Sequence, residues 1–193
     1  MRPIVGVDML YIAEFDEVDG TFSTPVHVPK LMNVKKNPKA ETEKLYADNG
    51  TAESYTKTSE NDIEIEVTEM TYDLRAIFNG HKHLHGALIK NTSDQGNYLA
   101  VGYRAKKSNG KYRYYWLQKV KFEPIPEEAE TEGDKIKFQT LKIKGSAIGD
   151  EAGDYEVTMD EDGEESIPAI IENWFASVVT PDDIINYTET PEG

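Results

Sequence analysis

The sequence predicts a mainly β fold, a β-sandwich or barrel-like domain with one short and one longer packed α-helix and an extended loop or hairpin arm. Apolar and polar residues alternate along most of the 193 residues, and an Asn-Gly pair joins two of the alternating segments. Only two stretches have the spacing of an amphipathic helix. We expect a single domain over residues 1–181, in which residues 37–60 form a projecting arm, and a flexible C-terminal tail over residues 182–193.

The opening residues 4–15 (IVGVDMLYIAEF) carry few polar side chains and predict a long first strand. Residues 61–70 (NDIEIEVTEM) alternate most clearly, which predicts a strand with one buried face and one solvated face. The side chains expected to point into the core from that strand are Ile63, Ile65 and Val67.

The segment from 97 to 122 predicts a hairpin, because Asn109-Gly110 separates two alternating stretches. Its second strand places aromatic residues in phase with one another and cations out of phase, which indicates one core face and one wet face. A rival interpretation is a stacking platform for single-stranded nucleic acid, which would need the rings and the cations on the same exposed surface. The residues expected on the core face are Tyr112, Tyr114, Trp116, Val120 and Phe122, and those on the wet face are Lys111, Arg113, Lys119 and Lys121.

A further strand is expected over residues 135–145 (KIKFQTLKIKG). The apolar residues before and after Gln139-Thr140 are out of phase with each other. A β-bulge near Gln139 or Thr140 would restore the alternation, and we expect one there.

Two stretches predict helices. In residues 71–80, Thr71 is a suitable N-cap and Gly80 a suitable left-handed stop, and Leu74, Ile77 and Phe78 share one face. In residues 166–181 (SIPAIIENWFASVVTP), Pro168 suits the first turn and Pro181 closes the segment. The apolar stripe expected on this longer helix consists of Ile167, Ile170, Ile171, Trp174, Phe175 and Val178.

Composition limits the classes of function. The chain has no cysteine, which excludes disulfides, thiolate nucleophiles and thiolate metal sites. No apolar run is long enough for a membrane span and no signal peptide is evident, so we expect a cytoplasmic product without a membrane partner. The net charge of −15 opposes binding to phosphate backbones. The charges are segregated, because residues 95–122 contain no acid, whereas nine of the sixteen residues from 150 to 165 are acidic and predict a solvated loop.

Three histidines at alternate positions, His81, His83 and His85, raise the question of a metal site. On a strand their imidazoles would share one face, and three histidines are a common ligand set of catalytic zinc. Gly80, however, ends the first helix and places the three residues in the turn before the next strand, where the shared face is lost. We interpret them as a solvated connector.

Other motifs of site chemistry are incomplete. Residues 158–169 fit a calcium loop poorly, because Thr158 and Ala169 stand where the loop needs strong oxygen ligands. Gly110-Lys111 lacks both the upstream glycine and the following Ser or Thr of a phosphate loop. We therefore expect no catalytic residues, no metal and no cofactor.

The arm over residues 37–60 is mostly polar, and its large apolar residues are Leu45, Tyr46 and Tyr55. Asp48-Asn49-Gly50 provides a turn at the middle, so the segment can run out and back as a hairpin. A hairpin alone buries too little to be stable, and a neighbouring subunit could supply the missing surface. The competing interpretation is a mobile surface loop. The residues expected at a subunit interface are Leu45, Tyr46, Asp48, Asn49, Gly50 and Tyr55.

Several segments, taken in order, resemble one protein family over about residues 4–176. They are IVGVDMLYIA, LYADNGTAES, the short helix ending in NGH, LAVGYRAKKSNGKYRYYWLQKVKF, PEEAETEGDKIKFQT and IENWF. Together they are similar to the major tail protein, or tail tube protein, of long-tailed bacteriophages (siphophages), of the phi-thirteen type. The resemblance lies in the ordered set, since no single motif is chemically specific.

The resemblance implies a structural virion protein rather than an enzyme. Its members form homohexameric rings of β-sandwich subunits that stack into a tail tube, through which DNA passes without specific binding. Tape-measure and tail terminator proteins are the implied partners, and the virion, with the host cytoplasm during assembly, is the implied location. The resemblance also favours the arm over the mobile loop, because tail tube subunits are joined ring to ring by such segments.

Two functions therefore follow as hypotheses. The first is a self-assembling tube subunit, in which exposed strand edges pair between copies and a basic hairpin of one subunit meets an acidic segment of the next. The alternative is a monomeric β-barrel that binds nucleic acid through the basic hairpin over residues 104–121. Fold alone does not decide between them.

Overall fold

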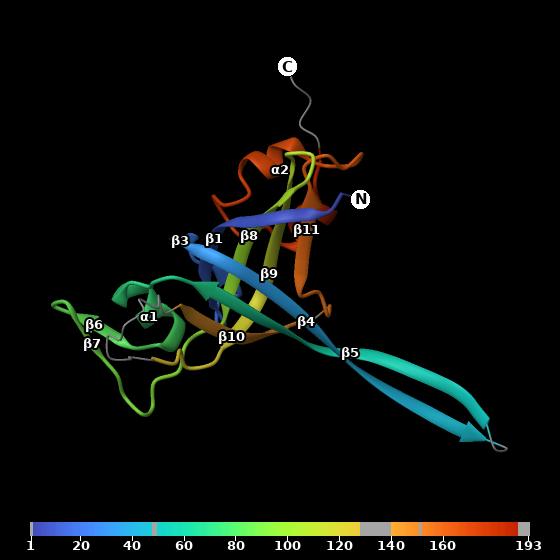
Figure 1. The fold of residues 1–193 in the computed structure, drawn as a ribbon, viewed down its shortest axis with the longest axis horizontal. Coiled ribbons are helices and arrows are strands. Elements are labelled where there is room, and N and C mark those ends of the chain that lie inside the picture. The colour runs from blue at the N-terminus through green and yellow to red at the C-terminus, as the bar shows by residue number, and fades with distance from the viewer. Residues whose placement is uncertain (1, 48–49, 128–139, 151, 189–193) are drawn as a thin grey trace, which may run out of the picture.

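The computed structural model describes residues 2–47, 50–127, 140–150 and 152–188, and it describes residues 40–60 by their backbone alone. The prediction of a mainly β fold is confirmed, because the described chain forms a nine-stranded antiparallel sheet, a two-stranded sheet and three short helices (Figure 1). The strands of the large sheet are β1 (Ile4–Asp16), β2 (Thr21–Phe22), β3 (Val26–Val28), β4 (Leu31–Ala47), β5 (Gly50–Val67), β8 (Leu99–Lys107), β9 (Tyr112–Phe122), β10 (Leu141–Ile148) and β11 (Glu156–Asp160).

The strands follow the order β2-β1-β8-β9-β10-β5-β4, with β3 on β1 and β11 on β9. One edge of β9 is shared, since residues 113–117 pair with β11 and residues 119–122 pair with β10. Strand β3, at one end of the order, runs into β4 at the other end after two residues, Pro29 and Lys30. The sheet consequently curls, and both of its ends contribute side chains to one core.

This first core lies inside the curl and is covered by α1 (Tyr72–Asn79), which buries Leu74 and Phe78. The cap predictions are confirmed. The Thr71 hydroxyl accepts a hydrogen bond from the backbone N–H of Leu74, and Gly80 stops the helix in the left-handed region with φ 70°. The predicted inward residues of β5 are confirmed as well, and the fully buried members of this core include Leu10, Ile12, Val28, Ile63, Ile65, Val67, Leu99, Leu117 and Ile143.

The predicted burial of Tyr114, Trp116, Val120 and Phe122 is confirmed, but the prediction that they share one face is wrong, because β9 contains a β-bulge. Leu99 pairs with Val120 and Val101 pairs with Leu117, so Ala100 of β8 faces two residues of β9, Gln118 and Lys119. The extra residue reverses which side chains point inward. Tyr114 and Trp116 point to one side of the sheet, and Tyr115, Leu117, Val120 and Phe122 point to the other.

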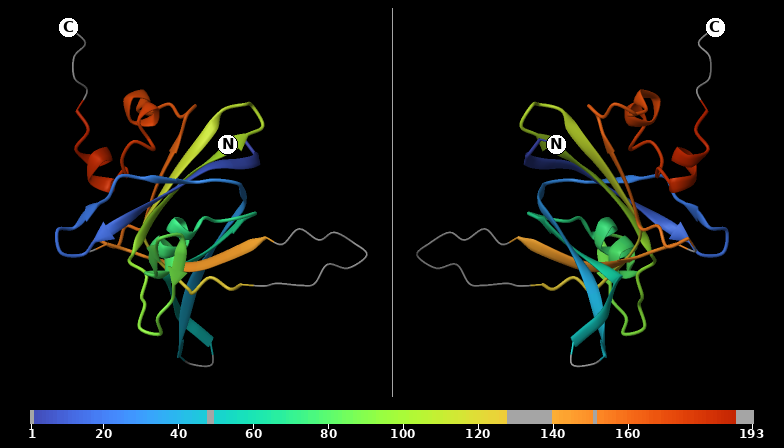
Figure 2. Two further views of the ribbon diagram at one scale, coloured as in Figure 1. Left: turned by 90° about the vertical axis from the view of Figure 1, so that its left-hand side faces the viewer. Right: turned by 90° about the vertical axis from the view of Figure 1, so that its right-hand side faces the viewer.

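Both faces of β9 are buried as a result, and the second face carries a separate core. Trp116 fills this core opposite Gly102, where a Cβ would lie 2.7 Å from the indole ring. The C-terminal segment covers it from outside, and Figure 2 shows that segment, in red, apart from the green helix α1. The buried residues of the second core are Ala13, Ala100, Tyr114, Trp116, Val157, Trp174, Val178 and Val179.

The predicted long helix over residues 166–181 is also wrong. Helix α2 (Pro168–Glu172) starts at the expected proline but ends after five residues, and the chain continues in tight turns such as Trp174 N–H to Ile171 C=O. The segment after it then buries Trp174, Val178 and Val179 on the sheet.

The predicted flexible tail does not begin at residue 182. Residues Pro181–Ile185 form α3, which opens with a reciprocal capping box. The Thr180 hydroxyl accepts a hydrogen bond from the Asp183 N–H, and the Asp183 carboxylate accepts one from the Thr180 N–H at 2.8 Å. Pro181 therefore begins a helix rather than closing the previous one.

Strands β4 and β5 form the longest hairpin of the molecule, and the predicted arm falls on it. They pair from Leu31–Val67 to Ala47–Gly50, and their outer part projects far from the body (Figure 1). At about 3.3 Å per residue, the 17 residues of β4 span about 56 Å. The expected turn at Asp48-Asn49, and residues 135–139 of the strand expected over 135–145, lie outside the described residues, so the bulge expected near Gln139 or Thr140 stays a prediction. The second half of that strand is confirmed, because residues 141–145 belong to β10.

Candidate assembly surface

The residues predicted for a subunit interface lie on the outer part of the β4–β5 hairpin. Leu45 of β4 pairs with Glu53, and Tyr55 of β5 pairs with Glu43, while Tyr46 and Gly50 lie nearer the tip. The backbone therefore brings them to one end of the hairpin. Their side-chain contacts, and Asp48 and Asn49 altogether, lie outside the described part of the chain.

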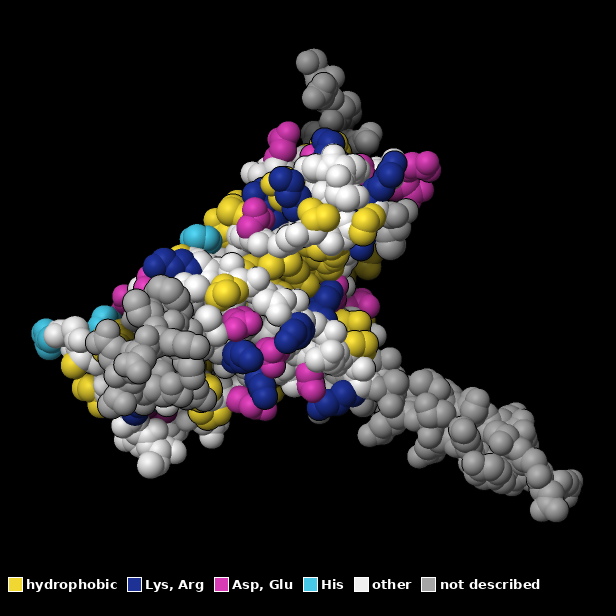
Figure 3. Space-filling model, in the orientation of Figure 1, with side chains coloured by type: hydrophobic (Ala, Val, Ile, Leu, Met, Phe, Trp, Pro, Cys, Tyr) yellow, Lys and Arg dark blue, Asp and Glu magenta, His cyan; other side chains and the backbone are white. Residues whose placement is uncertain are grey.

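The base of the hairpin carries a ladder of charges on its outer face. Strand β5 places Glu64 between Lys35 of β4 and Lys144 of β10, which are its partners in the strand register. Lys35 Nζ lies 3.2 Å from Glu64 Oε1, and its hydrogen bond lowers the pKa of Glu64, with Lys142 and Lys144 contributing. Figure 3 shows cationic and acidic side chains intermixed in this region, beside the hairpin.

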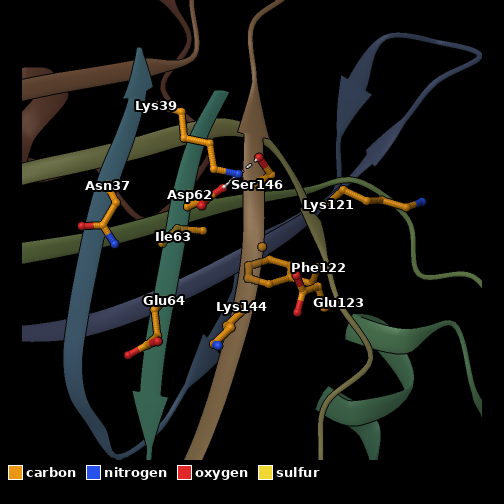
Figure 4. Close-up of a pocket in the computed structure, with 11 residues that line it drawn as sticks. Asn37, Lys39, Asp62, Ile63, Glu64, Lys121, Phe122, Glu123, Lys144 and Ser146 are labelled. Carbon is orange, nitrogen blue, oxygen red and sulfur yellow. Dashed lines mark hydrogen bonds and ion pairs between the residues drawn. The ribbon is translucent and has the colours of Figure 1, made fainter. Parts of the chain in front are cut away.

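A polar groove of about 490 Å³ crosses this ladder (Figure 4). Lys39 Nζ lies 3.0 Å from Asp62 Oδ1, and the Ser146 hydroxyl lies 3.5 Å from the same oxygen. Side chains from three strands thus meet at Asp62, as an ion pair with Lys39 and a hydrogen bond with Ser146. Such a surface can form hydrogen bonds with a polar partner. The groove is open to solvent and does not enclose a reaction site.

The inner face of the hairpin base carries Lys36, which the sequence reasoning missed. Its Nζ lies 2.6 and 2.8 Å from the two carboxylate oxygens of Glu156 on β11. The same ammonium lies 4.2 Å from the centroid of the Tyr115 ring, which stacks on Tyr103 at 4.6 Å. Burial is the first cause that raises the pKa of both tyrosines, and Glu156 adds to it.

The alternation of apolar and polar residues along β4 could have indicated that Lys36 points inward. Val34 and Lys36 share a phase, and their partners on β5 are the buried Ile65 and Ile63. A lysine in the inward phase of a strand needs an acidic partner, because burying an unpaired charge is costly. The sequence does not reveal that this partner comes from β11, 120 residues later in the chain.

The basic hairpin over residues 104–121 binds acids of its own chain. Arg113 forms two hydrogen bonds to Asp160, at 2.6 and 2.8 Å, and Lys111 Nζ lies 2.8 Å from Glu161. Lys107, whose side chain is 2% exposed, contacts both Asp160 and Asp162. Elsewhere on the hairpin, Arg104 is held by Asp8 at 2.6 Å and lies over the Tyr112 ring.

One prediction about charge is corrected. The acidic stretch over residues 150–165 is not wholly a solvated loop, because residues 156–160 form β11 on the edge of β9. The basic hairpin pairs with this acidic segment of its own chain, and the expected contact between subunits stays a prediction. The carboxyl pKa values fall accordingly: Asp160 through Arg113 and then Lys107, Asp162 through Lys107 and then Asn109, and Glu161 through Lys111.

The histidines lie in a more ordered setting than the predicted loop. His83 belongs to β6 (Lys82–Leu84), which pairs with β7 (Ala87–Ile89), and His85 follows in the turn. His81 Nδ1 lies 2.8 Å from Asp94 Oδ2, and His83 Nδ1 lies 2.5 Å from Asp73 Oδ1. In the described residues no three His, Cys, Asp or Glu side chains form a group that could hold a metal ion.

Comparisons of the sequence with protein-family models and with curated proteins find no match in either set. Among the described residues, no helix is long and apolar enough to cross a membrane.

Proposed function

We propose that this chain is a structural virion protein, a tail tube subunit that assembles into six-membered rings and stacks into a DNA-conducting tube. The proposal extends the resemblance of the sequence to phage major tail proteins. The observation that carries it is the long β4–β5 hairpin, which reaches away from both cores of its own subunit (Figure 1). A two-stranded hairpin is marginal alone in water, so this one is expected to gain a surface from a neighbour.

A strand edge that has no paired strand among the described residues supports the same proposal. Residues 4–8 of β1 pair with β8 on one side, whereas β3 joins the other side only from Leu10 onward. This edge carries exposed apolar side chains at Ile4 and Val5, which are 45% and 64% exposed. Strand β4, by contrast, carries Lys35, Lys36 and Pro38, residues that discourage edge pairing. The start of β1 is therefore the better site for strand addition between subunits.

The proposed role is mechanical rather than catalytic. The net charge of −15 suits a tube through which DNA slides without adhering. Tape-measure and terminator proteins are the proposed partners at the two ends of the tube, with the host cytoplasm as the place of assembly and the virion as the final location. No cofactor is part of the proposal.

The alternative, a monomer that binds nucleic acid through residues 104–121, gains less support. Four of the cations on that hairpin, Arg104, Lys107, Lys111 and Arg113, already pair with carboxylates of the same chain. Its aromatic residues Tyr114, Tyr115 and Trp116 are buried, so they offer no face for base stacking.

Mass photometry of the purified chain over a range of concentrations, combined with retention of single-stranded DNA on a filter, tests the proposal against the alternative. We expect a species of six subunits and no retained DNA above background. A chain that stays monomeric at every concentration and retains DNA would favour the nucleic-acid binder.

A further inference from the structure

The ion pair of Lys36 is a second link between the hairpin and the body, besides the pairing of β5 with β10 over residues 61–67. Lys35, the preceding residue, pairs with Glu64 on β5, which is the other strand of the same hairpin. Lys36 points to the opposite face and pairs with Glu156 on β11, a strand that belongs to the body. The Thr158 hydroxyl donates a hydrogen bond to Glu156 Oε1 at 2.7 Å, which helps to orient the carboxylate.

The ion pair between Lys36 and Glu156 is partly buried. The Lys36 and Glu156 side chains are 29% and 15% exposed, and the ammonium rests over the stacked rings of Tyr115 and Tyr103. An ion pair in this setting is screened less by salt than an exposed pair, and the rings add a cation–π attraction. The Lys36–Glu156 pair can therefore keep one geometry. A fully exposed ion pair would instead sample several side-chain conformations.

An irregularity in the strand pairing lies just beyond Lys36. The pairing of β4 and β5 shifts between Lys39 and Ala40, because Lys39 pairs with Glu60 and Ala40 with Thr58, which leaves Ser59 without a partner in the register. A bulge of this kind bends a strand and increases its twist. Pro38, one residue before Lys39, has no backbone N–H to donate. The outer hairpin thus joins the inner part at a bend.

We infer that Lys36 is a positioning residue for the arm: its pair with Glu156 over Tyr115 ties the edge strand β4 to β11 and so sets the twist with which the β4–β5 hairpin leaves the body. Releasing the pair leaves the β4–β5 and β5–β10 pairing intact but frees the β4 edge from β11, so that the direction of the outer hairpin varies more widely. This direction is a property of the single chain. Its consequence, that the direction selects which surface of a neighbouring subunit the arm reaches, rests on the proposed function.

Distance measurements between two spin labels test this inference directly. The chain contains no cysteine, so Val18→Cys on the body and Thr51→Cys on the hairpin can be labelled without background. Val18 is 92% exposed and lies in the turn between β1 and β2. Labelled protein diluted into an excess of unlabelled protein reports distances within one chain, whether or not the chains assemble.

We expect a narrow distance distribution for the parent protein and at least a twofold broadening for Lys36→Met, which keeps the aliphatic stem and removes the charge. Glu156→Gln should broaden the distribution in the same way, and Lys36→Arg should keep it narrow. The matched control is Lys35→Met, which removes a pair within the hairpin and should leave the width unchanged. Circular dichroism and the emission of the buried Trp116 and Trp174 verify the fold of each variant.

A folded Lys36→Met or Glu156→Gln variant with the parent width would overturn the inference, as would equal broadening by Lys35→Met. A chain that never forms rings but shows the expected widths contradicts the proposed function and supports the positioning role of Lys36.

Discussion

Trp116 and Trp174 hold the C-terminal segment on the sheet through two buried hydrogen bonds. The Trp116 indole N–H donates to the Trp174 carbonyl at 2.8 Å, and the Trp174 indole N–H donates to the Tyr115 carbonyl at 3.3 Å. Both side chains are at most 1% exposed. Each indole therefore contributes packing and satisfies a buried carbonyl of the other segment.

We predict that Trp116→Ala lowers the free energy of unfolding by about 3–5 kcal/mol, because it removes buried apolar area and leaves a cavity. Urea unfolding followed by circular dichroism measures this. Tyr187→Ala, at a partly exposed ring in the same C-terminal region, is the control and should change stability little. A Trp116→Ala variant with parent stability but altered binding of single-stranded DNA would restore the stacking interpretation.

The carboxylates around Lys107 and Arg113 make stability depend on acid pH. Their folded pKa values lie below the ordinary values, so the unfolded chain binds protons first as the pH falls. The stability they contribute is fully present above the unfolded pKa values, near 4, and is lost as the pH falls through the lower folded values.

Asp160→Asn should cost about 2 kcal/mol at neutral pH, because it removes the bidentate partner of Arg113 and one partner of the buried Lys107. The difference from the parent should shrink as the pH falls below about 4. Urea unfolding at several pH values tests both statements, and Glu69→Gln, at an exposed pair with Lys30, serves as control. A difference that stays constant across the acid range would contradict the assignment of Asp160.

At the scale of elements, the sequence predicted the features that depend on residues close together in the chain. The caps Thr71 and Gly80 were readable because capping depends on a few adjacent residues, and the inward phase of Ile63, Ile65 and Val67 was readable from period-two alternation. The same local approach failed at residues 166–181. There the first helix ends at Glu172, the chain continues in tight turns, and the capping box at Thr180 and Asp183 starts a second short helix.

Long-range pairing accounts for the other failures. The bulge at Gln118-Lys119 follows from how β8 and β9 register, and nothing within β9 alone indicates it. The partners of Lys36 and Lys107 lie 120 and 55 residues away, so the sequence shows the charges without showing which ones meet. For the candidate surface, the sequence predicted the arm and its apolar residues but not its anchor at Lys36.

The outer part of the β4–β5 hairpin projects away from the two cores, so we predict that it can be removed without unfolding the body. Deleting residues 40–56 and bridging the gap with a short Gly-Ser linker should leave the melting temperature of the body within a few degrees, about what a change under 1 kcal/mol gives. Rings of this variant should no longer stack, which electron microscopy would reveal. Tubes of normal length from the folded deletion variant would remove the hairpin from the mechanism.

At the scale of the whole molecule, one subunit combines two buried cores with features that only an assembly would complete. The cores on the two faces of the sheet make the body rigid, and α1 and the C-terminal segment seal them. Among the described residues, the start of β1 pairs with a strand on one side alone, and the outer part of the β4–β5 hairpin projects away from the body (Figure 1). Closed rings satisfy such surfaces, because heterologous contacts between copies end where the ring closes.

The central claim, assembly into a tube, is tested most directly by negative-stain electron microscopy of the purified chain at rising concentration. We predict rings of six subunits with a central hole and, at higher concentration, stacks of rings that share one axis. Single particles of one subunit at every concentration, with no ring or tube even after prolonged incubation, would contradict the account.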